Sequence, residues 1–157
     1  MNLPAEPNTG PEAFVWPIRV YFEDTDTGGI VFYANYLKFF ERARSEWLRA
    51  CGIGQRLLSE ASGTMFVVRS TSVDYRAPAR LDDTIETRTR VSRIGRASVD
   101  FDQQAWCEGT LLAAGTIRVG CVDRATMKPA AIPSEVLDAL QGGPLKRAET
   151  HRGELMA

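Results

Sequence analysis

Apolar residues between positions 36 and 51 recur at spacings of three and four. This periodicity predicts a helix of about four to five turns with one broad buried face. The face consists of Tyr36, Leu37, Phe40, Ala43, Trp47, Leu48 and Cys51. Gly52 is the expected stop, because glycine readily adopts the left-handed backbone that ends a helix. We expect Glu41, Arg42 and Arg44 on the exposed face, in local ion pairs.

Alternation of apolar and polar residues with a period of two predicts strands on both sides of this helix. A first, half-buried strand is expected from Phe14 to Phe22. Four more strands with short connections are expected at 65–75, 84–94, 97–107 and 111–123. Short helices are predicted at 53–60 and from Ser134, whose side chain can cap the first turn, to Leu140.

The order of these elements, one strand, a long helix and then four strands, is typical of an α+β fold with an antiparallel sheet. A single helix covers only one face, so we expect the sheet to curl around it. That arrangement leaves a sheet edge and an apolar flank, which a second copy of the chain can cover. We expect one domain at 14–140, a flexible N-terminal arm at 1–13 and a flexible polar tail at 141–157.

Charge and cysteine usage narrow the classes of function. The chain has 19 basic and 20 acidic side chains, so its net charge of -1 creates no general attraction to nucleic acid or an anionic membrane. No segment reaches the roughly eighteen apolar residues of a membrane helix, and the N-terminus lacks the pattern of a signal peptide. Three widely spaced cysteines without metal-ligand spacing are typical of reduced thiols. We therefore expect a soluble cytoplasmic protein that holds no metal.

The residues with chemical potential lie just before the long helix. The only histidine, His151, is in the polar tail, so serine or cysteine triads and most zinc sites lack their base or ligand. Carboxylates remain as acid, base or nucleophile. Asp24 and Asp26 precede Gly28 and Gly29, which allow the backbone to bend sharply and approach a ligand.

An Asp-x-Asp pair often does no more than accept hydrogen bonds from nearby amides. In this context a second role is open. A carbonyl placed between Asp26 and the start of the helix would meet both a carboxylate and unpaired backbone N–H groups.

The stretch EDTDTGGIVFYANY at 23–36, followed by FFERAR at 39–44, resembles the signature of hotdog-fold acyl-CoA thioesterases of the 4-hydroxybenzoyl-CoA thioesterase family. Three later segments are similar to the bacterial Tol-Pal-associated members: MFVVR at 65–69, YRAPARLDD at 75–83 and CVDRATMKP at 121–129. The resemblance implies a hotdog fold, in which an antiparallel sheet curls around one long central helix. It also implies hydrolysis of an acyl-CoA to a free carboxylic acid and CoA, in a homodimer or homotetramer with the active site at the dimer interface.

In this family the catalytic aspartate corresponds to Asp26, as nucleophile or as general base on water, and both roles stay open. The backbone N–H that polarises the thioester carbonyl corresponds to that of Tyr33, and Gly28 and Gly29 lie beside the substrate. Many Tol-Pal-associated members have histidine at the position of Tyr33 and tyrosine at that of Phe22. These two aromatic residues resemble the pocket of aromatic-acyl enzymes, or they serve ordinary packing.

The turn between the third and fourth strands carries Arg93 and Arg96, with Ser98 just after it. In the family this turn lies near the nucleotide of coenzyme A, and the planar arginine fork suits phosphate. A basic turn is equally compatible with a solvated surface. No cofactor is expected, since coenzyme A is part of the substrate.

One alternative is a non-catalytic module that binds an acyl thioester or a cell-envelope partner. Asp26 separates the two hypotheses, because a binding module does not need an uncompensated carboxylate beside an electrophilic carbonyl. A dehydratase of the same fold would need a histidine partner for its acid.

Overall fold

The computed structural model describes residues 13–54 and 63–144. The elements follow in the order β1 (Phe14–Arg19), the 3-10 turn η1 (Phe22–Asp24), α1 (Asn35–Ala50), β2 (Thr64–Tyr75), β3 (Thr84–Ile94), β4 (Ser98–Cys107) and β5 (Thr110–Asp123). Residues 134–144 form a further helix. The predicted helix at 53–60 and most of the predicted arm and tail lie outside the described residues. Residues 141–144, predicted to belong to a flexible tail, are instead helical.

The five strands form one antiparallel sheet in the order β1-β3-β4-β5-β2. Consecutive hairpins join β3, β4 and β5. Glu108 and Gly109 connect β4 to β5 with positive φ angles of 47° and 80°, as a two-residue turn between right-twisted strands requires. β1 and β2 are the two edges. The antiparallel α+β arrangement predicted from the order of elements is confirmed.

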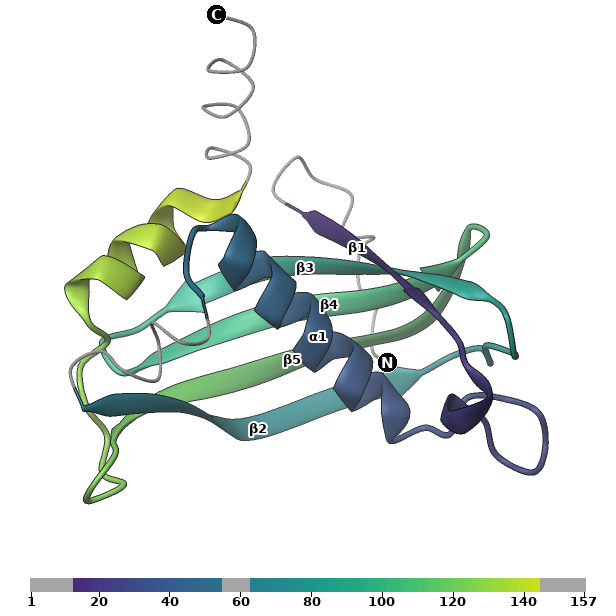
Figure 1. Ribbon diagram of the computed structural model, residues 1–157, viewed down its shortest axis with the longest axis horizontal. Coiled ribbons are helices and arrows are strands. Elements are labelled where there is room, and N and C mark those ends of the chain that lie inside the picture. Colours follow the sequence, from purple (N-terminus) through teal and green to yellow (C-terminus); the bar gives the residue numbers. More distant parts are fainter. Residues whose placement is uncertain (1–12, 55–62, 145–157) are drawn as a thin grey trace, which may run out of the picture.

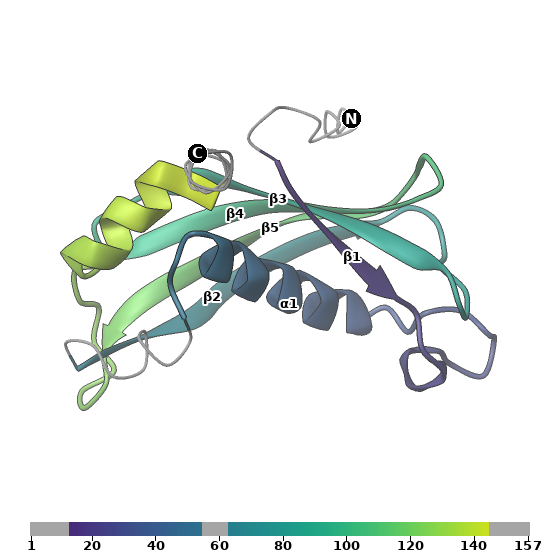
Figure 2. The ribbon, with the colours of Figure 1, turned by 45° about the horizontal axis from the view of Figure 1, so that its top comes forward.

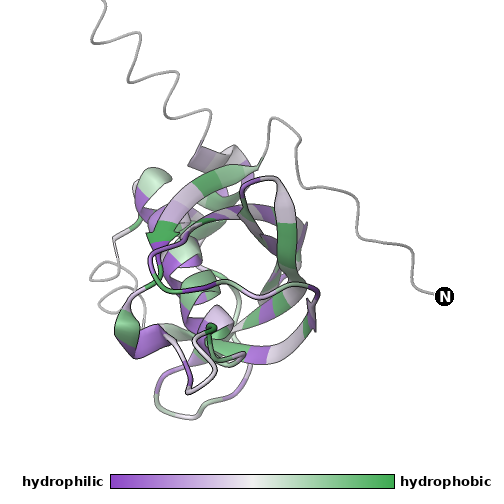
Figure 3. Cartoon of the chain, turned by 90° about the vertical axis from the view of Figure 1, so that its right-hand side faces the viewer, coloured by the Kyte–Doolittle hydropathy of each residue, from purple (hydrophilic) through white to green (hydrophobic). Residues whose placement is uncertain are grey.

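The long helix α1 lies along one face of the sheet (Figures 1 and 2), and the end-on view in Figure 3 shows the sheet curving around it. Phe39 and Phe40 of α1 are fully buried, and Trp47 meets Phe101 of β4 edge-on with 5.7 Å between ring centroids. Each such side chain stabilises the fold by about 1.5–3 kcal/mol when it leaves water. The predicted stop is also confirmed, since Gly52 has a φ of 87°.

The prediction for the buried face of α1 is wrong at two positions. Leu37, expected in the core, is 41% exposed, and Arg44, expected at the surface, is only 9% exposed. The helix packs chiefly against β3 and β1. Leu37 and Arg44 are seven residues apart and therefore share the flank of α1 that faces away from those two strands. The sheet beneath this flank belongs to β2, β4 and β5, and its side chains bury Arg44.

The first strand is shorter than predicted. It ends at Arg19, and the chain then turns because the Asp24 carboxylate accepts a hydrogen bond from the Tyr21 N–H at 2.8 Å. Phe22, expected to continue the strand on its buried side, lies in η1 and is 81% exposed.

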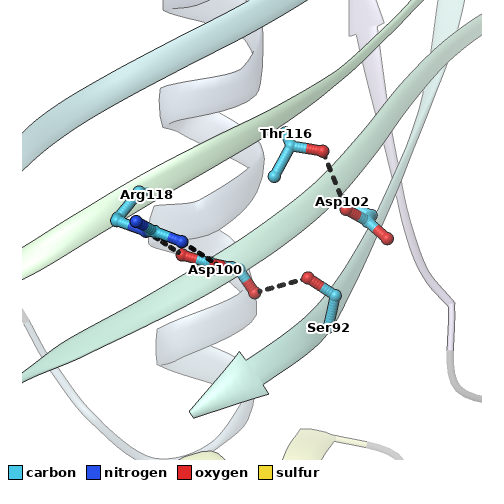
Figure 4. Close-up of polar contacts among 5 residues, drawn as sticks. All are labelled: Ser92, Asp100, Asp102, Thr116 and Arg118. Atoms are coloured by element: carbon cyan, nitrogen blue, oxygen red, sulfur yellow. Dashed lines mark hydrogen bonds and ion pairs between the residues drawn. The ribbon is translucent and has the colours of Figure 1, made fainter. Parts of the chain in front are cut away.

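The face of the sheet that points away from α1 carries a network of ion pairs and hydrogen bonds across β3, β4 and β5 (Figure 4). Arg118 binds Asp100 through two N–H donors at 2.9 and 3.1 Å, and the Thr116 hydroxyl donates to Asp102 at 3.0 Å. Arg118 lowers the pKa of the Asp100 carboxyl below its ordinary value, which burial opposes. The charged outer face predicted from the alternation is therefore present, although Asp100 itself is buried.

Candidate functional site

The loop between η1 and α1 is closed by the backbone of Asp24. The Asp24 carbonyl accepts hydrogen bonds from the Phe32 N–H at 3.0 Å and from the Asn35 side-chain amide at 2.7 Å. Its carboxylate accepts a hydrogen bond from the Tyr21 N–H. Asp24 is only 6% exposed. It therefore joins the end of the first strand to the start of α1, which fits a supporting role rather than contact with a substrate.

Asp26 lies at the exposed tip of the same loop. Its N–H donates to the Ile30 carbonyl at 2.8 Å, and its carboxylate Oδ1 accepts the Gly28 N–H at 2.8 Å. Within the described residues the second oxygen, Oδ2, accepts no hydrogen bond. Asp26 thus offers one free carboxylate oxygen to a ligand.

Gly28 and Gly29, which follow Asp26, each require glycine for a different physical reason. A Cβ at Gly28 would lie 3.1 Å from Asp26 Oδ1, so a side chain there would crowd the carboxylate. Gly29 has a φ of 78°, a left-handed conformation in which glycine is favoured, and donates its N–H to the Asp26 carbonyl at 3.0 Å. The predicted sharp bend of the backbone is therefore present.

The backbone N–H of Tyr33 is available at the start of α1. Asn35, Tyr36 and Leu37 each donate their N–H to the carbonyl three residues earlier. Within the described residues the Tyr33 N–H makes no such bond. Unpaired N–H groups at a helix start carry partial positive charge and suit a developing negative charge.

An aromatic cluster surrounds this helix start. The Tyr33 ring lies 4.8 Å from that of Phe32 and 5.9 Å from that of Tyr75 at the end of β2. Burial raises the pKa of the Tyr75 phenol, with a smaller contribution from Tyr33. Tyr33 is 62% exposed, and Phe22, more exposed still, makes no ring contact in the described part of the chain. Neither predicted pocket residue is therefore a packing residue of the core.

The predicted phosphate ligands lie at the other end of the sheet. The β3–β4 hairpin carries Arg93, Arg96 and Ser98. The Arg96 carbonyl of this hairpin accepts a hydrogen bond from the Ile132 N–H at 2.9 Å. β3 is 11 residues long, so its two ends are on the order of 30 Å apart. The Asp26 loop contacts the segment just before β3, through a bridge between Ile30 and Arg80. Within one chain, the structure therefore does not bring these residues to Asp26.

Two polar features of the interior have no clear signal in the sequence. The burial of Tyr36 was predicted, but the environment of its hydroxyl was not. Tyr36 is 3% exposed, and its hydroxyl makes no hydrogen bond of good geometry within the described residues. Burial raises the pKa of this phenol, while the nearby Ala79 backbone lowers it in part. The other feature is a buried contact between Arg44 and Gln103 at 2.9 Å. In the sequence Gln103 is only one polar residue in a strand, with nothing to mark it as fully buried.

Neither a metal-binding cluster nor a membrane-spanning helix is present in the described part of the chain. In residues 13–54 and 63–144, no group of three or more His, Cys, Asp or Glu side chains is placed to hold a metal ion. The cysteines are free thiols, and burial raises the pKa of Cys107 and Cys121. Across the same ranges no helix has the length and apolar character needed to cross a bilayer.

Comparison with known proteins identifies the family. Residues 20–140 match the family model of the thioesterase-like superfamily. This chain belongs to that superfamily. It is 45% identical over 123 residues to a protein named acyl-CoA thioesterase YbgC from Haemophilus influenzae, a match that covers 78% of this chain and 90% of that protein.

Solved structures of thioesterases share the fold. A probable thioesterase from Bartonella henselae superposes with a TM-score of 0.73 and 32% identity, covering 77% of this chain and 99% of that one. A gentisyl-coenzyme A thioesterase superposes with a TM-score of 0.73 and 27% identity, covering 81% and 99%. The hotdog fold implied by the resemblance is therefore confirmed.

Proposed function

We propose that this chain is an acyl-CoA thioester hydrolase, which releases a free carboxylic acid and CoA. Membership in the superfamily and the 45% identity to a protein named acyl-CoA thioesterase support the reaction class. The observation that carries the proposal is the loop before α1. It presents a free carboxylate oxygen of Asp26 and the unused N–H of Tyr33 from one short, internally hydrogen-bonded segment.

The two groups have complementary roles. The thioester carbonyl oxygen accepts the Tyr33 N–H, and the α1 dipole stabilises the negative charge that develops on this oxygen during attack. Asp26 then acts in one of two ways. As a nucleophile it forms a mixed anhydride and expels the CoA thiolate, and water later hydrolyses the anhydride; as a general base it takes a proton from the attacking water.

Exposure of this loop supports a site completed by a second copy. Asp26, Gly28 and Gly29 are all exposed in one chain, whereas catalysis of this kind benefits from exclusion of water. We propose a homodimer, paired into a homotetramer, with the active site at the dimer interface. Because Arg93 and Arg96 lie at the far end of β3, their proposed contact with the nucleotide then involves the hairpin of a second copy.

The acyl group and the cellular setting follow as further proposals. The exposed rings of Phe22 and Tyr33 favour an aromatic acyl group over a plain aliphatic one. Free cysteines favour the reducing cytoplasm. Association with the Tol-Pal system rests on the resemblance of the later segments alone.

A thiol-release assay tests the proposed reaction. The chain is incubated with short-chain, long-chain and aromatic acyl-CoAs, and released CoA is measured. Hydrolysis of at least one substrate, lost in Asp26→Asn, is expected. Binding of acyl-CoA without release of CoA by the parent chain would instead favour the non-catalytic binding module.

A further inference from the structure

The peptide unit between Phe32 and Tyr33 carries the N–H that the proposed hydrolysis uses. This unit is planar and trans, so its C=O and its N–H point in opposite directions. The Phe32 carbonyl accepts the backbone N–H of Asn35 at 2.8 Å, which holds the carbonyl toward the first turn of α1. The Tyr33 N–H is therefore directed away from that turn, and the bond from Asn35 fixes its direction.

The side chain of Asn35 makes a second connection, to the segment before the loop. Its amide Nδ2 donates to the Asp24 carbonyl oxygen at 2.7 Å. The same oxygen accepts the Phe32 N–H at 3.0 Å, so one carbonyl binds donors on both sides of Tyr33. Asp24 is buried and lies two residues before Asp26. These bonds therefore link the peptide that carries the Tyr33 N–H to the segment that carries the Asp26 carboxylate.

The start of α1 lacks the side-chain cap that is common at helix starts. Asparagine is a frequent cap because its side-chain oxygen accepts the free N–H groups there. At the cap position of α1 the residue is Ala34, which makes no side-chain hydrogen bond, and the first turn contains no acidic residue. The Asn35 amide is in that turn, yet it is bonded to the Asp24 carbonyl. The polar side chain at the helix start thus holds the loop and leaves the Tyr33 N–H to a ligand.

We propose that Asn35 is a positioning residue of the reaction centre. It does not touch the substrate, but it sets the direction of the Tyr33 N–H and the distance of this N–H from the Asp26 carboxylate. This role rests on the proposed hydrolysis, in which the N–H binds the thioester carbonyl. Both hydrogen bonds of Asn35 are made within one chain and need no contribution from a second copy.

Steady-state hydrolysis by the full chain tests this role, with the acyl-CoA that the parent chain hydrolyses fastest. Asn35→Leu keeps the size and branching of the side chain and removes the amide donor. We expect kcat to fall at least about tenfold, because a misplacement of about 1 Å can lower a rate by about 10²-fold. The KM should change by less than about twofold, since the N–H acts mainly on charge that develops in the transition state.

Thr87→Val is the matched control, because it removes a 2.6 Å bond from a side chain to the Trp16 backbone carbonyl in the sheet. Both changes should lower the melting temperature, but only Asn35→Leu should lower kcat. An equal loss of kcat in Thr87→Val would overturn the positioning role, since the loss would then follow stability. Asn35→Ala keeps the test decisive if Asn35→Leu fails to fold, because alanine favours the helix and also lacks the donor. A parental kcat in either Asn35 variant would overturn the role as well.

Raman difference spectra of bound acyl-CoA give a readout that stability does not move. The spectra use Asp26→Asn, in which the thioester should persist because the carboxylate is absent. A hydrogen bond from the Tyr33 N–H weakens the C=O bond of the thioester and lowers its stretching frequency relative to free acyl-CoA. Adding Asn35→Leu should remove most of this lowering, whereas adding Thr87→Val should keep it. A frequency unchanged by Asn35→Leu would overturn the role of Asn35.

Failure of the hydrolysis and failure of the positioning role give different results. If the parent chain binds benzoyl-CoA but releases CoA from no acyl-CoA, the proposed hydrolysis is wrong. The carbonyl frequency of bound benzoyl-CoA in the parent and in Asn35→Leu then decides the role of Asn35 at a binding site. If the parent hydrolyses an acyl-CoA and Asn35→Leu and Asn35→Ala match its kcat, the hydrolysis stands and the positioning role is wrong.

Discussion

Arg44 of α1 and Gln103 of β4 form a buried hydrogen bond, with 2.9 Å between Nη1 and Oε1. Through its amide nitrogen Gln103 also donates to the Phe40 carbonyl and the Thr89 hydroxyl, each at 2.9 Å. One fully buried side chain thus links the central helix to two strands. A polar contact in a core of this kind fixes the position of the helix, because each partner pays a desolvation cost if the helix shifts.

Replacing Gln103 should therefore destabilise the fold strongly. Gln103→Leu keeps the approximate volume but removes the only hydrogen-bond acceptor of Arg44 within the described residues. We expect a loss of about 2–4 kcal/mol in the free energy of unfolding, measured by urea denaturation. Thr116→Val, which removes an exposed hydrogen bond to Asp102, is the control. It should change the free energy of unfolding by less than about 0.5 kcal/mol. Equal effects of the two changes would contradict the role of Gln103.

The Asp100–Arg118 pair on the outer face of the sheet should make stability depend on pH. Arg118 holds the pKa of Asp100 in the folded protein below its ordinary value of 3.8. A lowered folded pKa means that the pair stabilises the fold above about pH 4 and that this stabilisation is lost as pH falls through the folded pKa. Asp100→Asn should therefore lower the melting temperature at pH 7 and show a smaller further drop between pH 4 and pH 2. If the melting temperature of the variant fell as steeply as that of the parent between pH 4 and pH 2, Asp100 would be excluded as the source of the pH dependence.

The two edge strands differ, and the difference predicts that the proposed dimer forms along β2 and not along β1. β1 contains Pro17, which has no N–H to offer a neighbouring strand, whereas β2 is 12 residues long and contains no proline. Val68 on β2 is 53% exposed, and Val15 on β1 is similarly exposed at 47%. We expect Val68→Asp to weaken the proposed dimer in sedimentation measurements, and Val15→Asp to leave it intact. A parent chain that sediments as a monomer at micromolar concentration would refute dimerisation itself.

The exposed hairpin arginines should contribute to substrate binding rather than to chemistry. Arg93→Ala combined with Arg96→Ala is expected to raise the KM for acyl-CoA far more than it lowers kcat, because contacts to a remote nucleotide are the same before and during bond breaking. Both side chains are exposed, so the fold should persist. Arg49→Ala provides a control at an exposed arginine on α1. An unchanged KM in the double variant would remove the hairpin from the site.

Local patterns predicted most of the elements but not their contacts. β3 has the predicted bounds because alternation along a strand is a local property, and the same holds for the length of α1. Which flank of α1 is buried depends on where the helix crosses the sheet, a tertiary property that periodicity does not contain. For this reason Leu37 and Arg44 exchanged their expected environments.

The candidate site shows the same limit. The sequence indicated the loop, its glycines and Asp26, since these residues act through local backbone geometry. Only the resemblance to the family assigned Arg93 to the same substrate site as Asp26. Within one chain the 11-residue length of β3 separates the two residues. The turn that exposes Phe22 depends on a hydrogen bond from Tyr21 to Asp24, which an alternating pattern does not reveal.

The two aspartates of the loop should separate catalysis from stability. Asp26→Asn keeps the shape of the side chain, and its amide oxygen can still accept the Gly28 N–H, but the negative charge and basicity are lost. We expect kcat to fall by at least about 10² to 10⁴, the usual contribution of a general base, and further if Asp26 is the nucleophile. The Kd for acyl-CoA should change little, because the Tyr33 N–H is untouched.

Asp24→Asn is the matched change two residues earlier. Its carboxylate accepts the Tyr21 N–H at 2.8 Å from a buried position, so loss of the charge should weaken the loop closure and lower the melting temperature. Much of kcat should remain. Single-turnover release of CoA and calorimetric melting of both variants give the comparison. If Asp26→Asn hydrolysed every acyl-CoA at the parent rate, the carboxylate at the loop tip would not carry the chemistry, and a non-catalytic acyl-thioester-binding role would be the better account of this loop.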